Sequence, residues 1–94
     1  MKIAIVDDEK LATARVKRLL GELNYEDITT FNDPLEALQS CSKIKYDVVF
    51  LDINMPSITG LELADKIVEL EPNTFIIFQT AYQEFAIEAG VFDS

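Results

Sequence analysis

Four short runs of strand-forming residues alternate with stretches of helical periodicity along this 94-residue chain, and this alternation constrains the fold most. The runs lie at residues 2–6, 28–31, 48–52 and 75–78. The first and the last are apolar on both faces, as strands covered on both sides of a sheet are. Strands that alternate with helices favour a parallel sheet with right-handed crossovers, so we predict a three-layer, doubly wound α/β domain.

Helix signals lie between these runs. Over residues 9–23 apolar side chains recur every three or four positions, which predicts a helix with one apolar stripe. That stripe consists of Ala12, Val16, Leu19, Leu20 and Leu23. Asn24 is suited to end this helix as a C-terminal cap. Asp33, followed by Pro34, and Thr59, three residues before Glu62, are residues that begin helices. We predict further helices over residues 34–42, 59–70 and 83–89.

Polar side chains follow three of the runs at the point where each strand ends. Asp7 and Asp8 follow the first run, Asp52 ends the third, and Thr80 comes just after the fourth. Ligands of parallel α/β sheets bind outside the carboxyl ends of the strands, so we expect these side chains to converge. Three carboxylates alone would repel one another, which raises their pKa values, whereas Mg²⁺ takes carboxylate oxygens and keeps some waters. The pattern therefore predicts a magnesium site.

Each of these residues also has a purely structural interpretation. Asp7 or Asp8 could cap the helix that follows, but a cap explains only one of the two. Asp52 could close a turn, although Thr59 is already placed to cap the next helix. For Thr80 taken alone, a helix or turn cap is the stronger interpretation. We favour the shared pocket because four polar side chains reach the same rim.

Asp52 ends a central strand, so we expect it to be the reacting group. A carboxylate can attack a phosphoryl group and form an acyl phosphate. Such a transfer depends mainly on positioning and on neutralising the phosphoryl oxygens. The backbone carbonyl of Asn54 could complete the metal shell, and the Thr80 hydroxyl could contact a phosphoryl oxygen.

Composition limits the partners of this chain. It has 8 Lys and Arg against 17 Asp and Glu, a net charge of −9, and no basic stripe, so we expect no direct binding to nucleic acid. It has no histidine, so any phosphohistidine must come from a partner. Cys41 is the only cysteine, which excludes an internal disulfide and fits a reducing cytoplasm. No apolar run approaches the roughly 20 residues that span a bilayer, so we expect a soluble, cytoplasmic protein.

With these residues identified, the chain resembles the receiver domains of two-component response regulators, which are CheY-like. Three motifs carry the resemblance: Ile5-Val6-Asp7-Asp8, Val49-Phe50-Leu51-Asp52-Ile53-Asn54-Met55-Pro56 with Gly60, and Phe78-Gln79-Thr80-Ala81. The resemblance implies a flavodoxin-like fold with strand order 2-1-3-4. Residues 80–89 also resemble the subgroup of receivers that precede LytTR-type DNA-binding domains.

The resemblance implies a role for each site residue. Asp52 accepts a phosphoryl group from a phosphohistidine on a sensor histidine kinase. Asp8 holds Mg²⁺ directly and Asp7 through water, together with Asp52 and the Asn54 carbonyl. Thr80 is the switch hydroxyl that moves toward the phosphoryl group. The chain is then a phosphoacceptor signalling domain that controls transcription through an output domain. It is no enzyme beyond its own phosphorylation and dephosphorylation.

The chain departs from the family at its end. Receivers have a fifth strand that ends in a Lys-Pro pair and then a fifth helix, whereas this sequence stops at Ser94. We therefore expect residues 1–94 to be a C-terminally truncated receiver domain without an output domain. Residues 75–78 would then form an apolar edge strand, through which we expect the chain to self-associate.

Two other functions remain open at this point. A phosphohydrolase with an aspartyl nucleophile needs a second acid two residues after the nucleophile, where this chain has Asn54. The second is an interaction module with a vestigial site. Such a module would not need the three intact acids, although the absence of the lysine of the Lys-Pro pair is consistent with it.

Overall fold

The computed structural model describes residues 1–79, which form four strands and three helices. In chain order these are β1 (Ile3–Val6), α1 (Lys10–Glu22), β2 (Ile28–Phe31), α2 (Pro34–Cys41), β3 (Val48–Asp52), α3 (Gly60–Leu70) and β4 (Phe75–Gln79). The four predicted strands and the first three predicted helices are confirmed, and no end differs from its prediction by more than one residue. The helix predicted over residues 83–89 lies outside the described residues.

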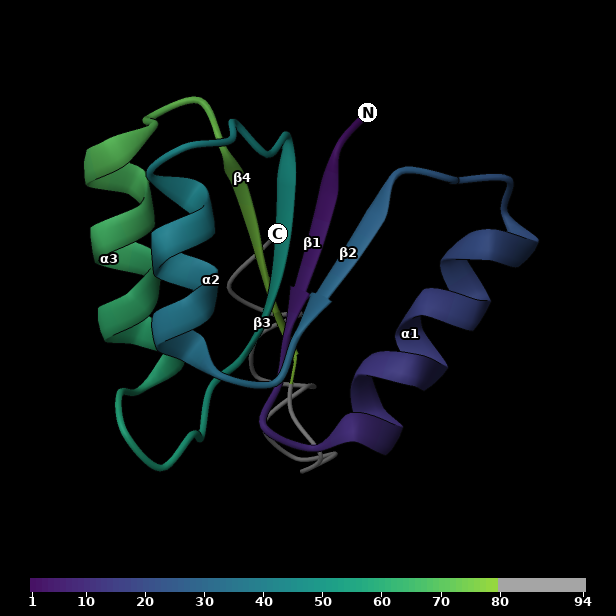
Figure 1. The fold of residues 1–94 in the computed structure, drawn as a ribbon, viewed down its shortest axis with the longest axis horizontal. Helices are drawn as coiled ribbons and strands as arrows, with labels where there is room; N and C mark the ends of the chain where they lie inside the picture. The colour runs from purple at the N-terminus through teal and green to yellow at the C-terminus, as the bar shows by residue number, and fades with distance from the viewer. Residues whose placement is uncertain (80–94) are drawn as a thin grey trace, which may run out of the picture.

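The strands form one parallel sheet with the order β2-β1-β3-β4, as the resemblance implied. Figure 1 shows α1 on one face of this sheet and α2 with α3 on the other, which makes the predicted three layers. Val6 of β1 pairs with Leu51 of β3, and Leu51 pairs with Phe78 of β4. The carboxyl ends of these three strands therefore lie in line along one rim.

The main core lies between the sheet and the pair α2 and α3. Val49 and Leu51 of β3 and Leu63 and Ile67 of α3 are almost completely buried there. On the opposite face of the sheet α1 is the only described helix, and it packs on β1 and β2. On that face Ile5 of β1 pairs with Phe50 of β3, and Phe50 pairs with Ile77 of β4. Ile5 is buried, whereas Ile77 is 37% exposed.

The helix ends follow from local chemistry. The Asp33 carboxylate accepts a hydrogen bond from the Leu35 N–H at 2.9 Å, and the Thr59 hydroxyl accepts one from the Glu62 N–H at 3.2 Å. Both N-caps were predicted from the sequence. Asn24 follows α1 with a φ of 72°, the left-handed conformation that ends helices. Among the described helices, none is long and apolar enough to cross a bilayer.

Candidate functional site

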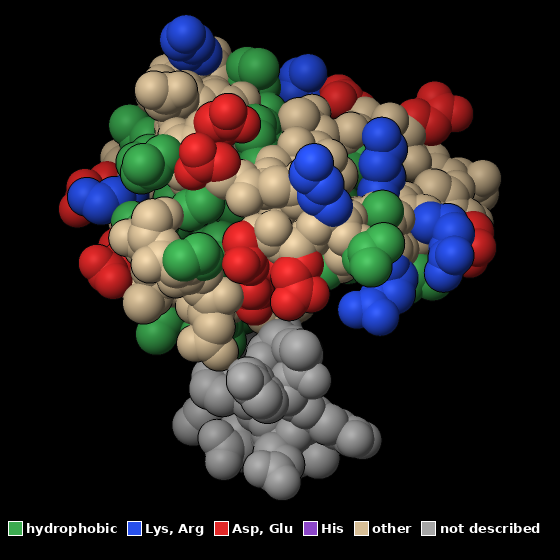
Figure 2. Space-filling model, turned by 60° about the horizontal axis from the view of Figure 1, so that its bottom comes forward, with side chains coloured by type: hydrophobic (Ala, Val, Ile, Leu, Met, Phe, Trp, Pro, Cys, Tyr) green, Lys and Arg blue, Asp and Glu red, His purple; other side chains and the backbone are tan. Residues whose placement is uncertain are grey.

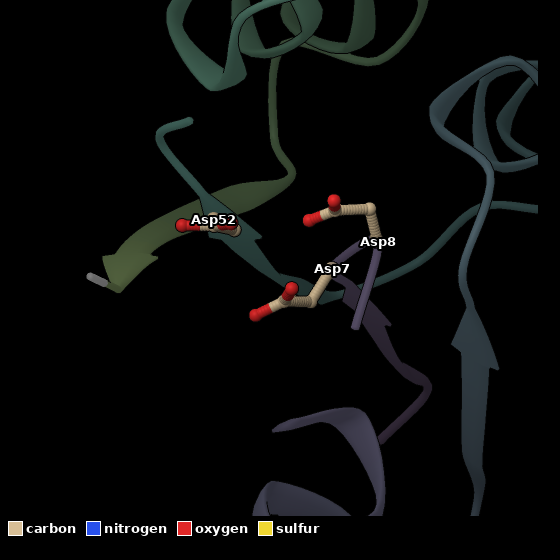
Figure 3. Close-up of side chains that lie close together, drawn as sticks. All are labelled: Asp7, Asp8 and Asp52. Carbon is tan, nitrogen blue, oxygen red and sulfur yellow. The ribbon is translucent and has the colours of Figure 1, made fainter. Parts of the chain in front are cut away.

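The three predicted carboxylates meet at the carboxyl rim of the sheet. Asp7 and Asp8 come from the loop after β1, and Asp52 is the last residue of β3 (Figure 3). One carboxylate oxygen from each lies within 4.8 Å of the other two. This spacing is short enough for a single cation to contact all three side chains. The parallel register produces the cluster, because Val6 and Leu51, the residues before Asp7 and Asp52, are partners.

Asp7 is the buried member of the cluster, with 7% of its surface exposed. Its Oδ1 accepts a hydrogen bond from the Glu9 N–H at 3.0 Å. Its backbone carbonyl accepts one from the Asn32 side-chain amide at 2.9 Å, and the same amide contacts the Thr13 hydroxyl at 3.1 Å. Asn32 therefore ties the ends of β1 and β2 to the first turn of α1. We did not single out Asn32 or Thr13 from the sequence, although Asn32 follows a strand just as Asp7 does.

Neither aspartate of the first loop is the N-cap of α1. That position is Glu9, whose side chain makes no capping hydrogen bond. The capping alternative for Asp7 and Asp8 therefore does not explain the pair. Likewise, Thr59 caps α3, so Asp52 is not needed for that task.

Gly60 fixes the loop that leaves Asp52. The Gly60 N–H donates a hydrogen bond to the Ile53 carbonyl at 2.8 Å, which folds the loop back onto the strand end. A Cβ at Gly60 would collide with the Asp52 carbonyl oxygen and lie 2.9 Å from the Ile53 Cα. The buried Met55 anchors the same loop in the core. Gly60, which the second motif of the resemblance includes, therefore shapes the loop beside Asp52.

Burial and mutual repulsion both act on these carboxylates. Burial raises the pKa of Asp7 to about 6, opposed by the Glu9 N–H and increased by the charges of Asp52 and Asp8. Burial also raises the pKa of Asp52, a shift that the Asn54 backbone opposes and the Asp8 charge increases. The predicted rise in pKa is therefore present at Asp7 and Asp52, but its largest cause is burial away from water and not repulsion between the carboxylates.

The donor set fits a hard divalent cation. It consists of carboxylate oxygens at an open rim, where a small ion such as Mg²⁺ would retain part of its water shell. A cation there would offset the charge that burial makes unfavourable on Asp7 and Asp52. Asn54 is exposed two residues after Asp52, and the ligand role of its carbonyl stays a prediction. Thr80 lies outside the described residues, so its role as a switch hydroxyl also stays a prediction.

A cavity of about 180 Å³ adjoins the cluster between the rim and α1. It is lined by Asp7, Glu9, Ala12, Arg15, Val16, Asp52 and Gln79 among the described residues. Figure 2 shows acidic side chains gathered on this side of the molecule. We did not single out Glu9 or Arg15 from the sequence. Their position beside Asp52 depends on how α1 packs on the sheet.

Comparison with known proteins agrees with this geometry. The family model described as the response regulator receiver domain matches residues 3–93. The chain is 42% identical over 91 residues to the positive alginate biosynthesis regulatory protein of Pseudomonas aeruginosa, covering 95% of this chain and 37% of that protein. It is 41% identical over 95 residues to the sensory transduction protein LytR of Staphylococcus saprophyticus, covering 100% of this chain and 37% of that protein.

A third relative, the transcriptional regulatory protein YpdB of Escherichia coli, is 41% identical over 90 residues, which cover 95% of this chain and 37% of that protein. The chain thus spans less than two fifths of the length of these curated relatives. Among solved structures, the response regulator TrrA of Thermotoga maritima in complex with Mg²⁺ and BeF superposes with a TM-score of 0.81 at 38% identity. That match covers 100% of this chain and 82% of the other.

Proposed function

This chain belongs to the response regulator receiver domain family, and we propose that Asp52 accepts a phosphoryl group from a phosphohistidine of a sensor histidine kinase. The observation that supports this most directly is the meeting of Asp7, Asp8 and Asp52 oxygens within 4.8 Å at one rim. The absence of histidine from the chain agrees with a domain that receives the phosphoryl group from a partner.

In the proposed reaction a carboxylate oxygen of Asp52 attacks the phosphorus atom. The bond between phosphorus and the imidazole nitrogen of the kinase breaks, its electron pair stays on that nitrogen, and Asp52 becomes an acyl phosphate. Asp8, Asp52 and the Asn54 carbonyl would hold Mg²⁺, with Asp7 acting through water. The ion would supply positive charge to the phosphoryl oxygens.

We further propose that the signal passes to an output domain that binds DNA, in the cytoplasm. The similarity to LytR and to YpdB, a transcriptional regulatory protein, supports this, as does the LytTR-like pattern of residues 80–89. In this scheme residues 1–94 are the receiver part of such a regulator. The phosphohydrolase alternative is not favoured, because Asn54 occupies the place of its second acid.

Self-association through β4 is a separate proposal. Within residues 1–79, β4 has a hydrogen-bonded neighbour only on the β3 side, and its Phe75 and Phe78 are 65% and 36% exposed. An apolar edge strand of this kind favours pairing with another chain. Sedimentation velocity over a wide concentration range tests it, and a single monomeric species throughout would rule it out.

Intact mass spectrometry after incubation with Mg²⁺ and acetyl phosphate tests the central proposal. We expect the wild-type chain to gain one phosphoryl group and Asp52→Asn to gain none. Asp65→Asn is the matched control, because Asp65 is an exposed acid on α3, outside the cluster. Labelling of Asp52→Asn equal to that of the wild type would refute the assignment of Asp52. Turnover of p-nitrophenyl phosphate would instead support the phosphohydrolase.

A further inference from the structure

We infer that Arg15 of α1 binds the phosphoryl group on Asp52, supplying a positive charge from the helix side of the pocket. The inference rests on the proposed function of Asp52 and adds a residue to that site. It starts from the cavity of about 180 Å³ that both side chains line. A single ordered water needs a cavity volume of only roughly 10–15 Å³, so this cavity has room for a group larger than water.

The position of Arg15 follows from the helix period. Ala12, Arg15 and Leu19 recur at three- and four-residue intervals, so they share one side of α1. Ala12 and the half-buried Val16 line the same cavity, which places Arg15 at the border between the packed side of the helix and the rim. Asp52 and its register partner Gln79 line the cavity from the side of the sheet.

Arg15 is the only basic side chain among the described residues that line this cavity. It is also uncommitted there, since the one ion pair within residues 1–79 joins Lys2 to Asp27 at 3.2 Å. Arg15 is exposed, so core packing does not account for its place at the mouth of this cavity, and its guanidinium has no carboxylate partner among those residues. An incoming anion in the cavity would supply such a partner.

The carboxylates of the site repel an incoming phosphoryl group, so its binding requires further positive charge. Asp7, Asp8, Asp52 and the neighbouring Glu9 carry four carboxylates, of which one Mg²⁺ would offset two. When the phosphoryl group is attached, the single charge of the Asp52 carboxylate is replaced by about two charges on the phosphoryl oxygens, so the site gains about one negative charge. The planar guanidinium fork matches two phosphoryl oxygens at once, which an ammonium group cannot do. Arg15 would therefore act after the group arrives on Asp52, and not in holding Mg²⁺.

This role predicts opposite effects on two ligands. Without Arg15 the site is more negative, so Mg²⁺ alone should bind as tightly as before or more tightly. Beryllofluoride added with Mg²⁺ imitates the phosphoryl group on Asp52, and its binding should weaken. Loss of charge-assisted hydrogen bonds corresponds to about tenfold or more in affinity. A merely structural role would weaken both ligands together.

Isothermal titration calorimetry on the 94-residue chain tests this with Arg15→Gln, Arg15→Lys and Arg18→Gln. Arg18 is the matched control: an exposed arginine on the same helix that does not line the cavity. We expect Arg15→Gln to weaken beryllofluoride binding about tenfold, Arg15→Lys to recover part of the loss, and Arg18→Gln to behave as the wild type. Mg²⁺ titrations of each variant show whether the site is still folded.

Three results would overturn the inference. They are unchanged beryllofluoride binding in Arg15→Gln, an equal loss in Arg18→Gln, or a parallel loss of Mg²⁺ binding in Arg15→Gln. A wild-type chain that binds Mg²⁺ but neither beryllofluoride nor a phosphoryl group would overturn the proposed function and this inference with it. Normal wild-type binding with an unaffected Arg15→Gln would overturn the role of Arg15 alone.

Discussion

Replacing Asp7 with Asn should stabilise the metal-free protein near neutral pH. Burial raises the pKa of this carboxyl from 3.8 to about 6 in the folded state. The folded protein therefore holds the proton more tightly than the unfolded chain. The ionised form is disfavoured by folding, and a difference of roughly 2 pKa units amounts to about 3 kcal/mol of unfolding free energy.

The sign of the pH dependence follows from the same two values. Between pH 3.8 and about 6 the folded protein carries more protons on Asp7 than the unfolded chain. The unfolding free energy therefore falls as the pH rises through this window, and the full penalty is present above it. Asn cannot ionise but keeps the oxygen that accepts the Glu9 N–H at 3.0 Å. Asp7→Asn should thus gain about 3 kcal/mol near pH 7.5, and only about 1 kcal/mol near pH 4.5.

Urea unfolding in the presence of a chelator measures both values. The control is Asp65→Asn on α3, an exposed acid outside the cluster whose replacement should change the unfolding free energy by less than about 0.5 kcal/mol. Adding Mg²⁺ should stabilise the wild type, because a ligand that binds only the folded state raises its stability, and should stabilise Asp7→Asn less. An Asp7→Asn variant that is less stable than the wild type without metal near pH 7.5 would refute the reasoning.

Three further substitutions test the framework of the site. Gly60→Ala should lower the unfolding free energy by about 1–3 kcal/mol and weaken Mg²⁺ binding, because its methyl group displaces the Asp52 backbone; unchanged Mg²⁺ affinity by calorimetry would contradict this. Asn32→Ala should cost about 1–3 kcal/mol in urea unfolding, because the Asp7 carbonyl loses its partner; a neutral result would mean that water replaces the amide. Thr59→Ala should cost about 1 kcal/mol through the lost N-cap while leaving Mg²⁺ affinity intact, and a large affinity loss would show that the cap also positions the acids.

The features that the sequence predicted correctly depend on neighbours within a few residues. Asp33 and Thr59 begin helices because their own side chains accept backbone N–H groups two or three positions later. The convergence of Asp7, Asp8 and Asp52 needed one further step, the rule that parallel strands end at a common rim. That rule fixes the place of a residue without any knowledge of side-chain packing.

The features that were missed depend on contacts between elements. Asn32 bonds to the Asp7 carbonyl across 25 positions of the sequence, and nothing local distinguishes it from an ordinary turn residue. The stripe on α1 also overstates burial. Leu19 and Leu23 are 49% and 67% exposed, because the helix covers only β1 and β2. A hydrophobic period indicates which side chains share a side of a helix, but the area of the opposing surface decides how many are buried.

The difference in burial between Asp7 and Asp8 couples the fold to the ligand. Asp7 is 7% exposed and fixed by the Glu9 N–H and the Asn32 amide, whereas Asp8 lies exposed beside it. A fixed, poorly solvated carboxylate has an unfavourable charge until a cation arrives, so in the proposed magnesium site part of the free energy of Mg²⁺ binding would be relief of this cost. Linkage makes the effect reciprocal. Any change that removes the unfavourable charge of Asp7, such as its protonation below about pH 6, must also lower the affinity for Mg²⁺. The affinity for Mg²⁺ should therefore fall in the same pH window in which the metal-free protein becomes more stable, and a single pH series of both quantities tests that they share one group.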